Sequence, residues 1–223
     1  MKVLLFGATG MVGQGVLREC LAAPDVELVR TVGRTATGVA APKLRETVHG
    51  DLFDYRALEP QLAGFDACFF CLGVSAAGMS EAAYTRLTYD LTLAAARTLA
   101  RLNPGMTFVY VSGEGTDGSE RGRVMWARVK GRTENAIRAL PFRAVYLFRP
   151  GIIQPMHGAR SKTQLYRVPY ALMAPFLPIM RRLAPQRVLT TEVVGRAMLA
   201  AARRGGPTMV AEIADINALG TIG

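Results

Sequence analysis

The chain is poor in cysteine and histidine, which limits its disulfide and metal chemistry. It has 223 residues with three cysteines, and His49 and His157 are its only histidines. An odd number of cysteines in a chain of this length does not indicate a disulfide framework. Cys68 and Cys71 form a C-x-x-C inside an apolar run, where residues three apart on a strand point to opposite faces. We therefore interpret both as small buried residues and predict no metal site, since zinc needs more ligands.

Acidic residues are also few. The chain has 17 aspartates and glutamates against 27 lysines and arginines, for a formal net charge of +10. This balance favours anionic partners such as nucleic acid, acidic lipids or phosphate-bearing cofactors. The basic residues are dispersed, however, without a zinc finger or a basic motif interleaved with aromatic residues. We interpret most of the charge as solvated surface and predict no specific nucleic-acid binding.

Long uninterrupted apolar runs are missing as well. Residues 160–187 are apolar, but prolines interrupt them, and arginines bound a stretch shorter than the roughly 20 apolar residues of a membrane helix. No transmembrane segment is predicted. We interpret this stretch as a cover over a substrate site or a contact surface, with peripheral membrane contact as the alternative. The N-terminal apolar run is too short for a signal peptide, so we expect a cytoplasmic protein.

Strand and helix patterns alternate along most of the chain, which favours a parallel sheet with helices on both faces. The patterns predict strands at residues 2–6, 26–32, 46–49, 67–72, 107–111, 143–148 and 208–213, and helices at 12–23, 55–62, 81–102, 124–140 and 191–203. We predict an α/β fold: a Rossmann-type, doubly wound, mostly parallel sheet with a small C-terminal extension. Residues 1–155 form the predicted Rossmann domain, and 156–223 form a substrate or cover region packed on it.

A glycine-rich turn joins the first strand to the first helix. Gly7–Gly13 has the pattern G-x-x-G-x-x-G, directly after a predicted strand and directly before a predicted helix. A glycine motif indicates a nucleotide site only in this context. Gly7 permits the sharp turn, Gly10 lets a pyrophosphate approach the backbone, and Gly13 lets the helix pack close to the sheet. The helix N-terminus then offers free N–H groups and a partial positive charge to phosphates. The turn predicts a dinucleotide site that also includes Thr9, Met11 and Val12.

The end of the second strand indicates which dinucleotide binds. NAD is held there by an acidic residue on the ribose 2′-hydroxyl, about 20 residues after the turn. This chain has Gly33 and Arg34 instead. An arginine pairs with a 2′-phosphate and stacks on adenine. We therefore favour NADP over NAD, with a merely solvated Arg34 as the alternative.

These motifs together resemble a known family. The G-A-T-G-x-x-G turn is followed in order by Gly33-Arg34, Gly50-Asp51-Leu52, Cys71-Leu72-Gly73, Val111-Ser112-Gly113 and Arg149-Pro150-Gly151. The chain resembles the atypical and extended short-chain dehydrogenases/reductases, and within them the small NAD(P)H-binding group typified by TIP30 and its bacterial relatives. The resemblance covers residues 1–155 well and the C-terminal third loosely.

The resemblance implies roles for the matching positions. Asp51 and Leu52 would meet the adenine, and Leu72 and Gly73 would line the ribose and pyrophosphate. Ser112 would end a strand beside the nicotinamide, and Lys130 would bind the nicotinamide ribose. The tripeptide Pro150, Gly151 and Ile152 would pass close to the nicotinamide carboxamide.

One departure from the family pattern concerns proton transfer. The family has Tyr-x-x-x-Lys on one helix, with both side chains on one face and the lysine charge favouring the tyrosinate. Here the tyrosine position holds Trp126, four residues before Lys130. An indole N–H donates a hydrogen bond but is no acid near neutral pH. The predicted catalytic set is therefore Ser112, Lys130 and Trp126, with the proton carried elsewhere by one of Tyr84, Tyr89, Tyr110 or Glu114.

Two classes of function follow. The first is an NADP(H)-dependent oxidoreductase on a small carbonyl, alcohol or quinone, with a degenerate catalytic site. The second is a non-catalytic NADPH-binding redox sensor or partner-binding protein, in which Trp126 fills the catalytic slot. The residues leave the substrate open, and both a monomer and a homodimer are compatible with the sequence.

Overall fold

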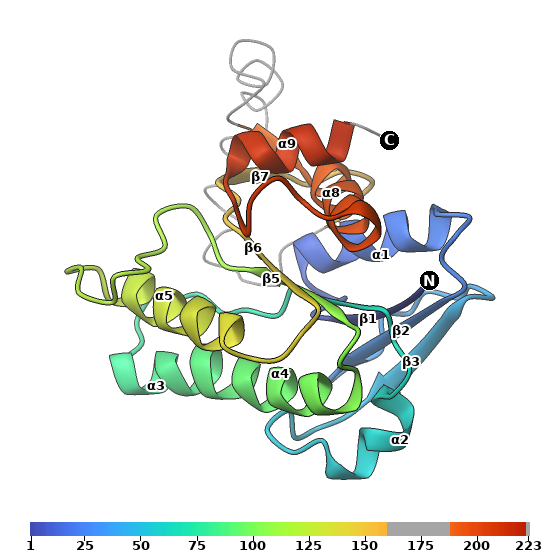
Figure 1. The fold of residues 1–223 in the computed structure, drawn as a ribbon, viewed down its shortest axis with the longest axis horizontal. Coiled ribbons are helices and arrows are strands. Elements are labelled where there is room, and N and C mark those ends of the chain that lie inside the picture. The colour runs from blue at the N-terminus through green and yellow to red at the C-terminus, as the bar shows by residue number, and fades with distance from the viewer. Residues whose placement is uncertain (160–187, 222–223) are drawn as a thin grey trace.

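The computed structural model of the protein describes residues 1–159 and 188–221 (Figure 1). In this part of the chain, one parallel sheet has the strand order β3-β2-β1-β4-β5-β6-β9. Its strands are β1 (Lys2–Phe6), β2 (Leu28–Gly33), β3 (Leu44–Val48), β4 (Ala67–Phe70), β5 (Thr107–Val111), β6 (Ala144–Phe148) and β9 (Val210–Ala211). The order reverses direction between β1 and β4, as in a doubly wound Rossmann sheet. The predicted fold class is confirmed.

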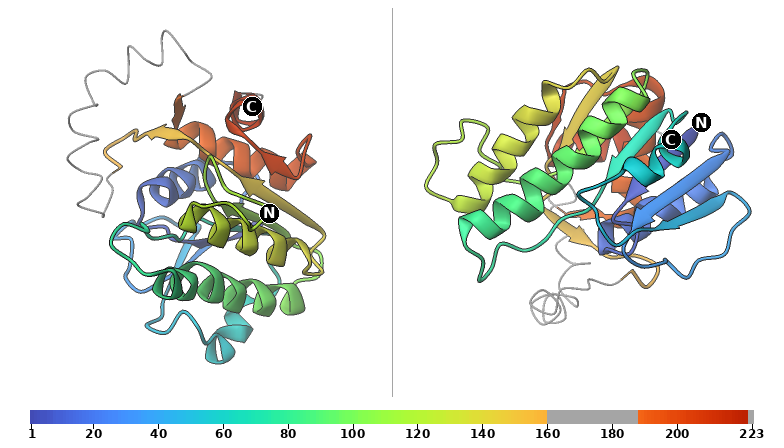
Figure 2. Two further views of the ribbon diagram at one scale, coloured as in Figure 1. Left: turned by 90° about the vertical axis from the view of Figure 1, so that its left-hand side faces the viewer. Right: turned by 90° about the horizontal axis from the view of Figure 1, so that it is seen from below.

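Helices cover both faces of the sheet. One face carries α1 (Met11–Ala22), α8 (Thr191–Arg204) and α9 (Ile213–Thr221), and the other carries α2 (Glu59–Leu62), α3 (Glu81–Thr85), α4 (Leu91–Leu102) and α5 (Met125–Arg138). The turned views in Figure 2 show the same two layers. Val3 and Leu5 of β1 enter the first core, while Leu4 and Phe6 enter the second. This explains why the strand is apolar from Val3 to Phe6, since neither face of these residues meets water.

The predicted 81–102 helix is continuous but not uniform. A π-helical turn, η2 (Arg86–Asp90), joins α3 to α4, and a 3₁₀ turn, η1 (Arg56–Leu58), precedes α2. Ser80 caps α3 by accepting a hydrogen bond from the Ala83 N–H. At the other end, the buried Asn103 side chain accepts from the Phe65 N–H and donates to the Leu62 carbonyl.

The two cysteines of the C-x-x-C lie on opposite faces, as the strand geometry predicts. Cys68 belongs to the core beneath α4. The Sγ atom of Cys71 instead lies 4.0 Å from the Sδ atom of Met198 on α8. Both thiols are free, and burial raises the pKa of each above its usual range. Cys68 is buried as predicted, but Cys71 is only partly buried, which corrects the prediction for that residue.

The C-terminal segment packs directly on the Rossmann domain. Helix α8 begins at the predicted cap, where Thr190 Oγ1 accepts from the Val193 N–H. It crosses α1 at two glycines: a Cβ added at Gly15 would lie 2.5 Å from Thr191 Cβ, and one added at Gly195 would lie 3.2 Å from the Gly15 carbonyl oxygen. Small residues at the crossing therefore permit close contact of the two helices.

The sequence prediction was wrong in three places near the C-terminus. Strand β9 is only Val210–Ala211, and Ile213 begins helix α9, which the pattern did not indicate. Strands β7 (Ile152–Gln154) and β8 (Val188–Thr190) pair in parallel, also unpredicted. Their partners are distant in sequence and three residues give no readable period. The predicted cover, residues 160–187, lies outside the described residues. Within the described residues 1–159 and 188–221, no helix is long and apolar enough to cross a membrane.

Candidate functional site

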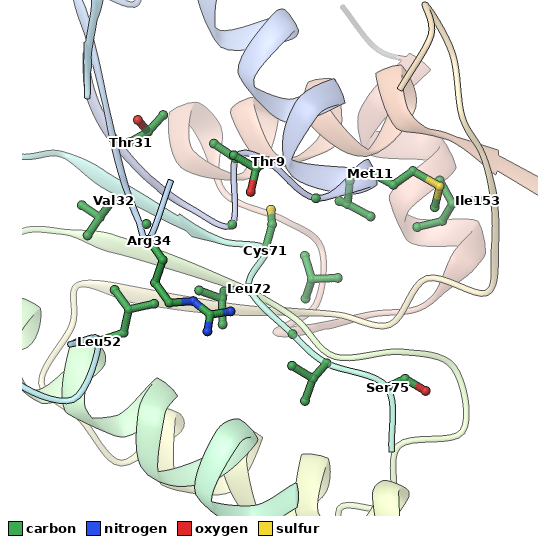
Figure 3. Close-up of a pocket in the computed structure, with 18 of the residues that line it drawn as sticks. Thr9, Met11, Thr31, Val32, Arg34, Leu52, Cys71, Leu72, Ser75 and Ile153 are labelled. Carbon is green, nitrogen blue, oxygen red and sulfur yellow. The ribbon is translucent and has the colours of Figure 1, made fainter. Parts of the chain in front are cut away.

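A pocket of about 800 Å³ opens along the carboxyl edge of the sheet (Figure 3). Its wall is built from the segments that follow β1, β2, β4, β5 and β6. The lining consists of Gly7–Val12, Thr31–Thr35, Thr37, Leu52, Cys71–Ser75, Val111–Ser112, Lys130, Pro150–Gly151 and Ile153. The pocket lies where the strand order reverses, which is where open α/β sheets bind ligands. Among the described lining residues, the only charged ones are the two cations Arg34 and Lys130.

The first end of the pocket is shaped by backbone. Gly7 has a φ of +79°, and a Cβ there would lie 2.7 Å from the backbone of Cys71 and Leu72. The Gly10 N–H donates to the Gly7 carbonyl at 2.9 Å. Gly10 is also the N-cap residue of α1, and no side chain caps this helix. A Cβ at Gly13 would overlap with the Gly7 carbonyl oxygen and lie 2.7 Å from its carbon. The first helical turn therefore has N–H groups without a side-chain cap beside the pocket, an arrangement that suits an anion.

Arg34 lies at the end of β2, beside this turn. Figure 3 shows its side chain reaching between Leu52 and Leu72 into the pocket. Within the described residues, no carboxylate pairs with its guanidinium. The nearby Glu46 carboxylate accepts hydrogen bonds from the N–H and the hydroxyl of Thr37, both at 2.6 Å. Arg34 is thus the charged group that this end of the pocket offers to an anion.

The second end of the pocket is shaped by side chains. The Ser112 hydroxyl is buried and donates to Glu134 Oε1 at 2.5 Å. Lys130 Nζ donates to the Ser112 backbone carbonyl. Burial disfavours the ammonium and lowers the pKa of Lys130 to about 8, although the nearby Glu134 carboxylate acts in the opposite direction. Lys130 therefore titrates close to neutral pH.

Glu134 was missed by the sequence analysis. It is only 1% exposed and forms two hydrogen bonds with Arg149: Nε to Oε1 at 3.0 Å and Nη2 to Oε2 at 2.5 Å. This pairing raises the pKa of Arg149. Arg149 also reaches Glu212, just before α9, at 3.2 Å. The available signal was its spacing from Lys130, which puts both on one face of α5, one turn apart.

Most of the predicted site residues line this pocket. They are Gly7, Thr9, Gly10, Met11, Val12, Arg34, Leu52, Leu72, Gly73, Ser112, Lys130, Pro150 and Gly151. Several other lining residues were not predicted from the sequence, including Thr31, Thr35, Thr37 and Ser75. They carry no motif of their own, and only the end of β2 and the segment after β4 bring them to this edge.

Four predicted residues lie outside the lining. Gly13 is behind the turn, where it permits helix packing. Asp51 Oδ1 accepts from the Phe53 N–H in its own loop. Ile152 alternates with Ile153, and Ile153 is the one that lines the pocket. Trp126 packs toward the loop before α5, 3.6 Å from a Cβ built at Gly115. The roles assigned to these residues stay predictions.

The proposed alternative proton donors do not line the pocket either. Tyr84 and Tyr110 are 1% and 2% exposed, and burial raises the pKa of Tyr110 above its usual range. The Arg132 guanidinium lies over the Tyr89 ring, with its Cζ atom 4.3 Å from the ring centroid. Glu114 is exposed, and its Oε2 would lie 2.6 Å from a Cβ added at Gly151. Of these four, only Glu114 is adjacent to the pocket wall.

Comparison with known proteins identifies relatives over most of the chain. A fungal protein named fmp52-2, mitochondrial, from Aspergillus oryzae is 29% identical over 97% of this chain and 95% of its own length. A second, fmp52 of Emericella nidulans, is 32% identical over 68% of this chain and 66% of its own. Rat protein HTATIP2 is 27% identical over 68% of this chain and 62% of its own.

Solved structures with low sequence identity share the fold. A short-chain dehydrogenase/reductase family oxidoreductase from Burkholderia thailandensis has a TM-score of 0.68 and 17% identity, over 98% of this chain and 92% of its own. The Bordetella bronchiseptica enzyme WbmF, solved with NAD⁺, has a TM-score of 0.67 and 17% identity, over 99% of this chain and 76% of its own. Identities this low support the fold alone.

The relatives correct one expectation. A cytoplasmic location was predicted, but the names of the fungal relatives describe them as mitochondrial, and this contradicts the prediction. Composition and a missing signal-peptide pattern were its only support.

The family is given by the chain's own central region. A family model described as NAD(P)H-binding matches residues 7–139, from the first glycine of the turn to the end of α5. This range holds the phosphate-binding turn, Arg34, Ser112 and Lys130. The protein therefore belongs to the NAD(P)H-binding family, and HTATIP2 is among its sequence relatives.

Proposed function

We propose that the pocket binds NADP(H) and that the protein is an NADP(H)-dependent oxidoreductase acting on a small carbonyl, alcohol or quinone. One observation carries this proposal. A pocket of about 800 Å³ joins a glycine turn and helix N-terminus to Lys130, and Arg34 and Lys130 are the only charged residues among its described lining. Such a lining suits a long ligand with several phosphates.

The phosphate end fits the dinucleotide in shape and charge. The backbone around Gly7 and Gly10 leaves no room for a Cβ at the first and little at the second, so the pyrophosphate would meet bare backbone there. The first turn of α1 would donate N–H groups to it. Arg34 would hold the 2′-phosphate, with Thr35 beside it in the lining. No described acidic residue lines the pocket at this point to accept from an NAD ribose.

The nicotinamide end fits the other half. Lys130 would bind the nicotinamide ribose, and the backbone of Pro150 and Gly151 would face the carboxamide. When bound, the cofactor supplies a hydride to the substrate or accepts one from it. Ile153 and Val111 give this end an apolar wall, which suits a small organic substrate.

Nucleotide titration tests the proposal. Trp126 is the only tryptophan and emits where reduced nicotinamide absorbs, so bound NADPH should accept energy from it. We expect saturable quenching of Trp126 with NADPH and weaker binding of NADH. Absence of saturable binding with both nucleotides, checked by calorimetry, would contradict the proposal.

A second function is favoured by a separate observation. Trp126 occupies the tyrosine position, and no tyrosine is among the described lining residues. A protein of this kind could bind NADPH as a sensor without reducing a substrate. NADPH that binds but stays unoxidised in the presence of aldehydes and quinones would favour this reading over the oxidoreductase.

A further inference from the structure

At the nicotinamide end of the pocket, the group that donates a proton to the substrate has to be one other than a tyrosine. Reduction of a carbonyl needs a group that releases a proton near neutral pH. Trp126 does not line the pocket, and its indole has no such acidity. Ser112 does line it, but its hydroxyl donates to the Glu134 carboxylate at 2.5 Å. Its single hydroxyl proton is therefore held by a partner within the protein.

Lys130 lines this end of the pocket, whereas Glu114 is exposed and lies only beside its wall. The Nζ atom of Lys130 lies 3.6 Å from a Cβ built at Gly113 and donates to the Ser112 carbonyl. An ammonium has three N–H donors, so one bond to Ser112 does not exhaust it. Burial also lowers its pKa to about 8, close to the ideal for an acid working near neutral pH.

We propose that Lys130 is the catalytic acid of this site, protonating the oxygen of an aldehyde or ketone directly, and that Glu134 is its positioning residue. This inference rests on the oxidoreductase function proposed above. It assigns to the lysine the proton transfer that a tyrosine would perform. It also narrows the substrate class to carbonyl compounds in the direction of reduction.

The step balances as follows. The carbonyl carbon gains a hydride from NADPH, which becomes NADP⁺. The π pair of the C=O bond moves to oxygen, which takes a proton from the Lys130 ammonium as one N–H bond breaks. Lys130 is left as a neutral amine and regains its proton from solvent. The products are the alcohol, NADP⁺ and the unchanged protein.

Glu134 affects Lys130 in two ways. It fixes the Ser112 segment, whose carbonyl accepts from Lys130. Its negative charge also favours the ammonium and opposes the effect of burial. Arg149, next to β6, is the charged group that faces Glu134 from the sheet. Glu134 is the only described charge that shifts Lys130.

The first test needs neither substrate nor cofactor. Trace acetylation with acetic anhydride labels neutral amines, and peptide mass spectrometry reports each lysine across pH. In the nucleotide-free protein, we expect Lys130 to reach half-labelling near pH 8, against about 10.4 for a free lysine side chain used as reference. The Glu134→Gln variant should move this midpoint to lower pH. A Lys130 midpoint in the ordinary lysine range would overturn the proposal.

The second test separates charge from proton donation. Lys130→Arg keeps a cation for the ribose, but a guanidinium does not release a proton near neutral pH. With NADPH and 4-nitrobenzaldehyde as the probe, we expect kcat to fall about 100-fold or more while NADPH affinity changes little. Lys43→Arg is the matched control, because Lys43 also donates to a backbone carbonyl, that of Ala23, but lies outside the pocket.

The outcomes distinguish the two proposals. Wild-type kcat that declines above about pH 8, together with loss in Lys130→Arg alone, supports Lys130 as the acid. A Lys130→Arg variant that retains the rate and pH profile overturns this role and leaves the oxidoreductase standing. Wild-type protein that binds NADPH but leaves the aldehyde unreduced overturns both, and a normal Lys130 labelling curve would then mark the lysine as a binding residue.

Discussion

The two ends of the pocket, where we propose that the phosphates and the nicotinamide bind, are built on different principles. The phosphate end is made of backbone from one continuous segment, Gly7–Gly13, in which side chains are absent where the ligand would approach. The nicotinamide end is made of side chains from three separate places: Ser112 after β5, Lys130 and Glu134 on α5, and Arg149 next to β6. The first is a local property of a short motif. The second exists only once β5, α5 and β6 are packed together.

The largest expected effect on stability comes from removing the buried carboxylate, Glu134, at the nicotinamide end. Glu134→Ala removes the buried carboxylate partner of Arg149, which keeps only the exposed Glu212, and leaves the Ser112 hydroxyl with only the Phe148 carbonyl as acceptor. We expect the free energy of unfolding to fall by about 3–5 kcal/mol, as for other broken buried ion pairs. Denaturant unfolding followed by circular dichroism measures this loss.

Glu212→Ala is the matched control for that variant. It removes only the outer partner of Arg149, because the Glu212 side chain is 49% exposed. Solvent screens such a pair, so the loss should stay below about 1 kcal/mol. Equal losses for the two variants would show that the buried pair does not anchor this end.

The corresponding change at the phosphate end is Gly13→Ala. A Cβ there would overlap with the Gly7 carbonyl oxygen, and backbone has no flexible end to move aside. We expect a loss of about 3 kcal/mol in unfolding free energy, the upper range for overpacking, together with loss of NADPH binding. Thermal unfolding and nucleotide titration measure the two effects.

Gly50→Ala serves as the control, because nothing lies within 4 Å of a Cβ there. It should leave both stability and NADPH binding near the wild-type values. If Gly13→Ala behaved in the same way, the close approach of α1 to β1 would not be what shapes the turn.

This difference explains what the sequence could predict. The strands at residues 2–6 and 107–111 match the structure to the residue, and Gly7, Gly10 and Arg34 line the pocket. These features depend on local periodicity or on a motif within a few residues. Glu134 was missed because an acid on an amphipathic helix is usually solvated. Only its pairing with Arg149, next to another strand, reveals it as buried.

Helix α9 and the β7–β8 pair were missed for a related reason. Ile213–Thr221 is short and mixed in character, and its helix packs against α8 rather than repeating a clear pattern. Ile152–Gln154 pairs with a strand far along the chain. Trp126 shows the same limit in the site, because its position on α5 was readable and its packing toward the Gly115 loop was not.

Stability at alkaline pH sharpens the comparison at the nicotinamide end. Lys130 has a pKa of about 8 in the folded protein, against about 10.4 when unfolded. Between these values the unfolded chain binds the extra proton, so this residue makes stability rise with pH. Relative to Lys130→Met, wild-type unfolding free energy should increase by up to about 3 kcal/mol from pH 7 to pH 10.

Comparing the two proteins at each pH cancels the buried cysteines and tyrosines, whose raised pKa values act in the opposite direction. Denaturant unfolding of both proteins at several pH values provides the measurement. A difference that stays flat with pH would mean that Lys130 keeps its ordinary proton affinity and that burial at this end is incomplete.

The mildest change tests the one side chain on which the phosphate end depends. Arg34→Ala removes a guanidinium that reaches into the pocket between Leu52 and Leu72. A charge-assisted hydrogen bond to a 2′-phosphate is worth about 1.5–3 kcal/mol, so NADPH affinity should fall roughly 10- to 100-fold. NADH, which lacks that phosphate, should lose much less. Parallel titrations with both nucleotides measure the ratio.

Arg45→Ala, on the neighbouring strand and outside the pocket lining, controls for the general loss of positive charge. If NADPH and NADH weakened equally in Arg34→Ala, the side chain would contact what they share, such as the adenine ring. The backbone turn would then account for binding without selecting between them. If only NADPH weakened, this end of the pocket would combine a general anion site made of backbone with one arginine that selects the cofactor.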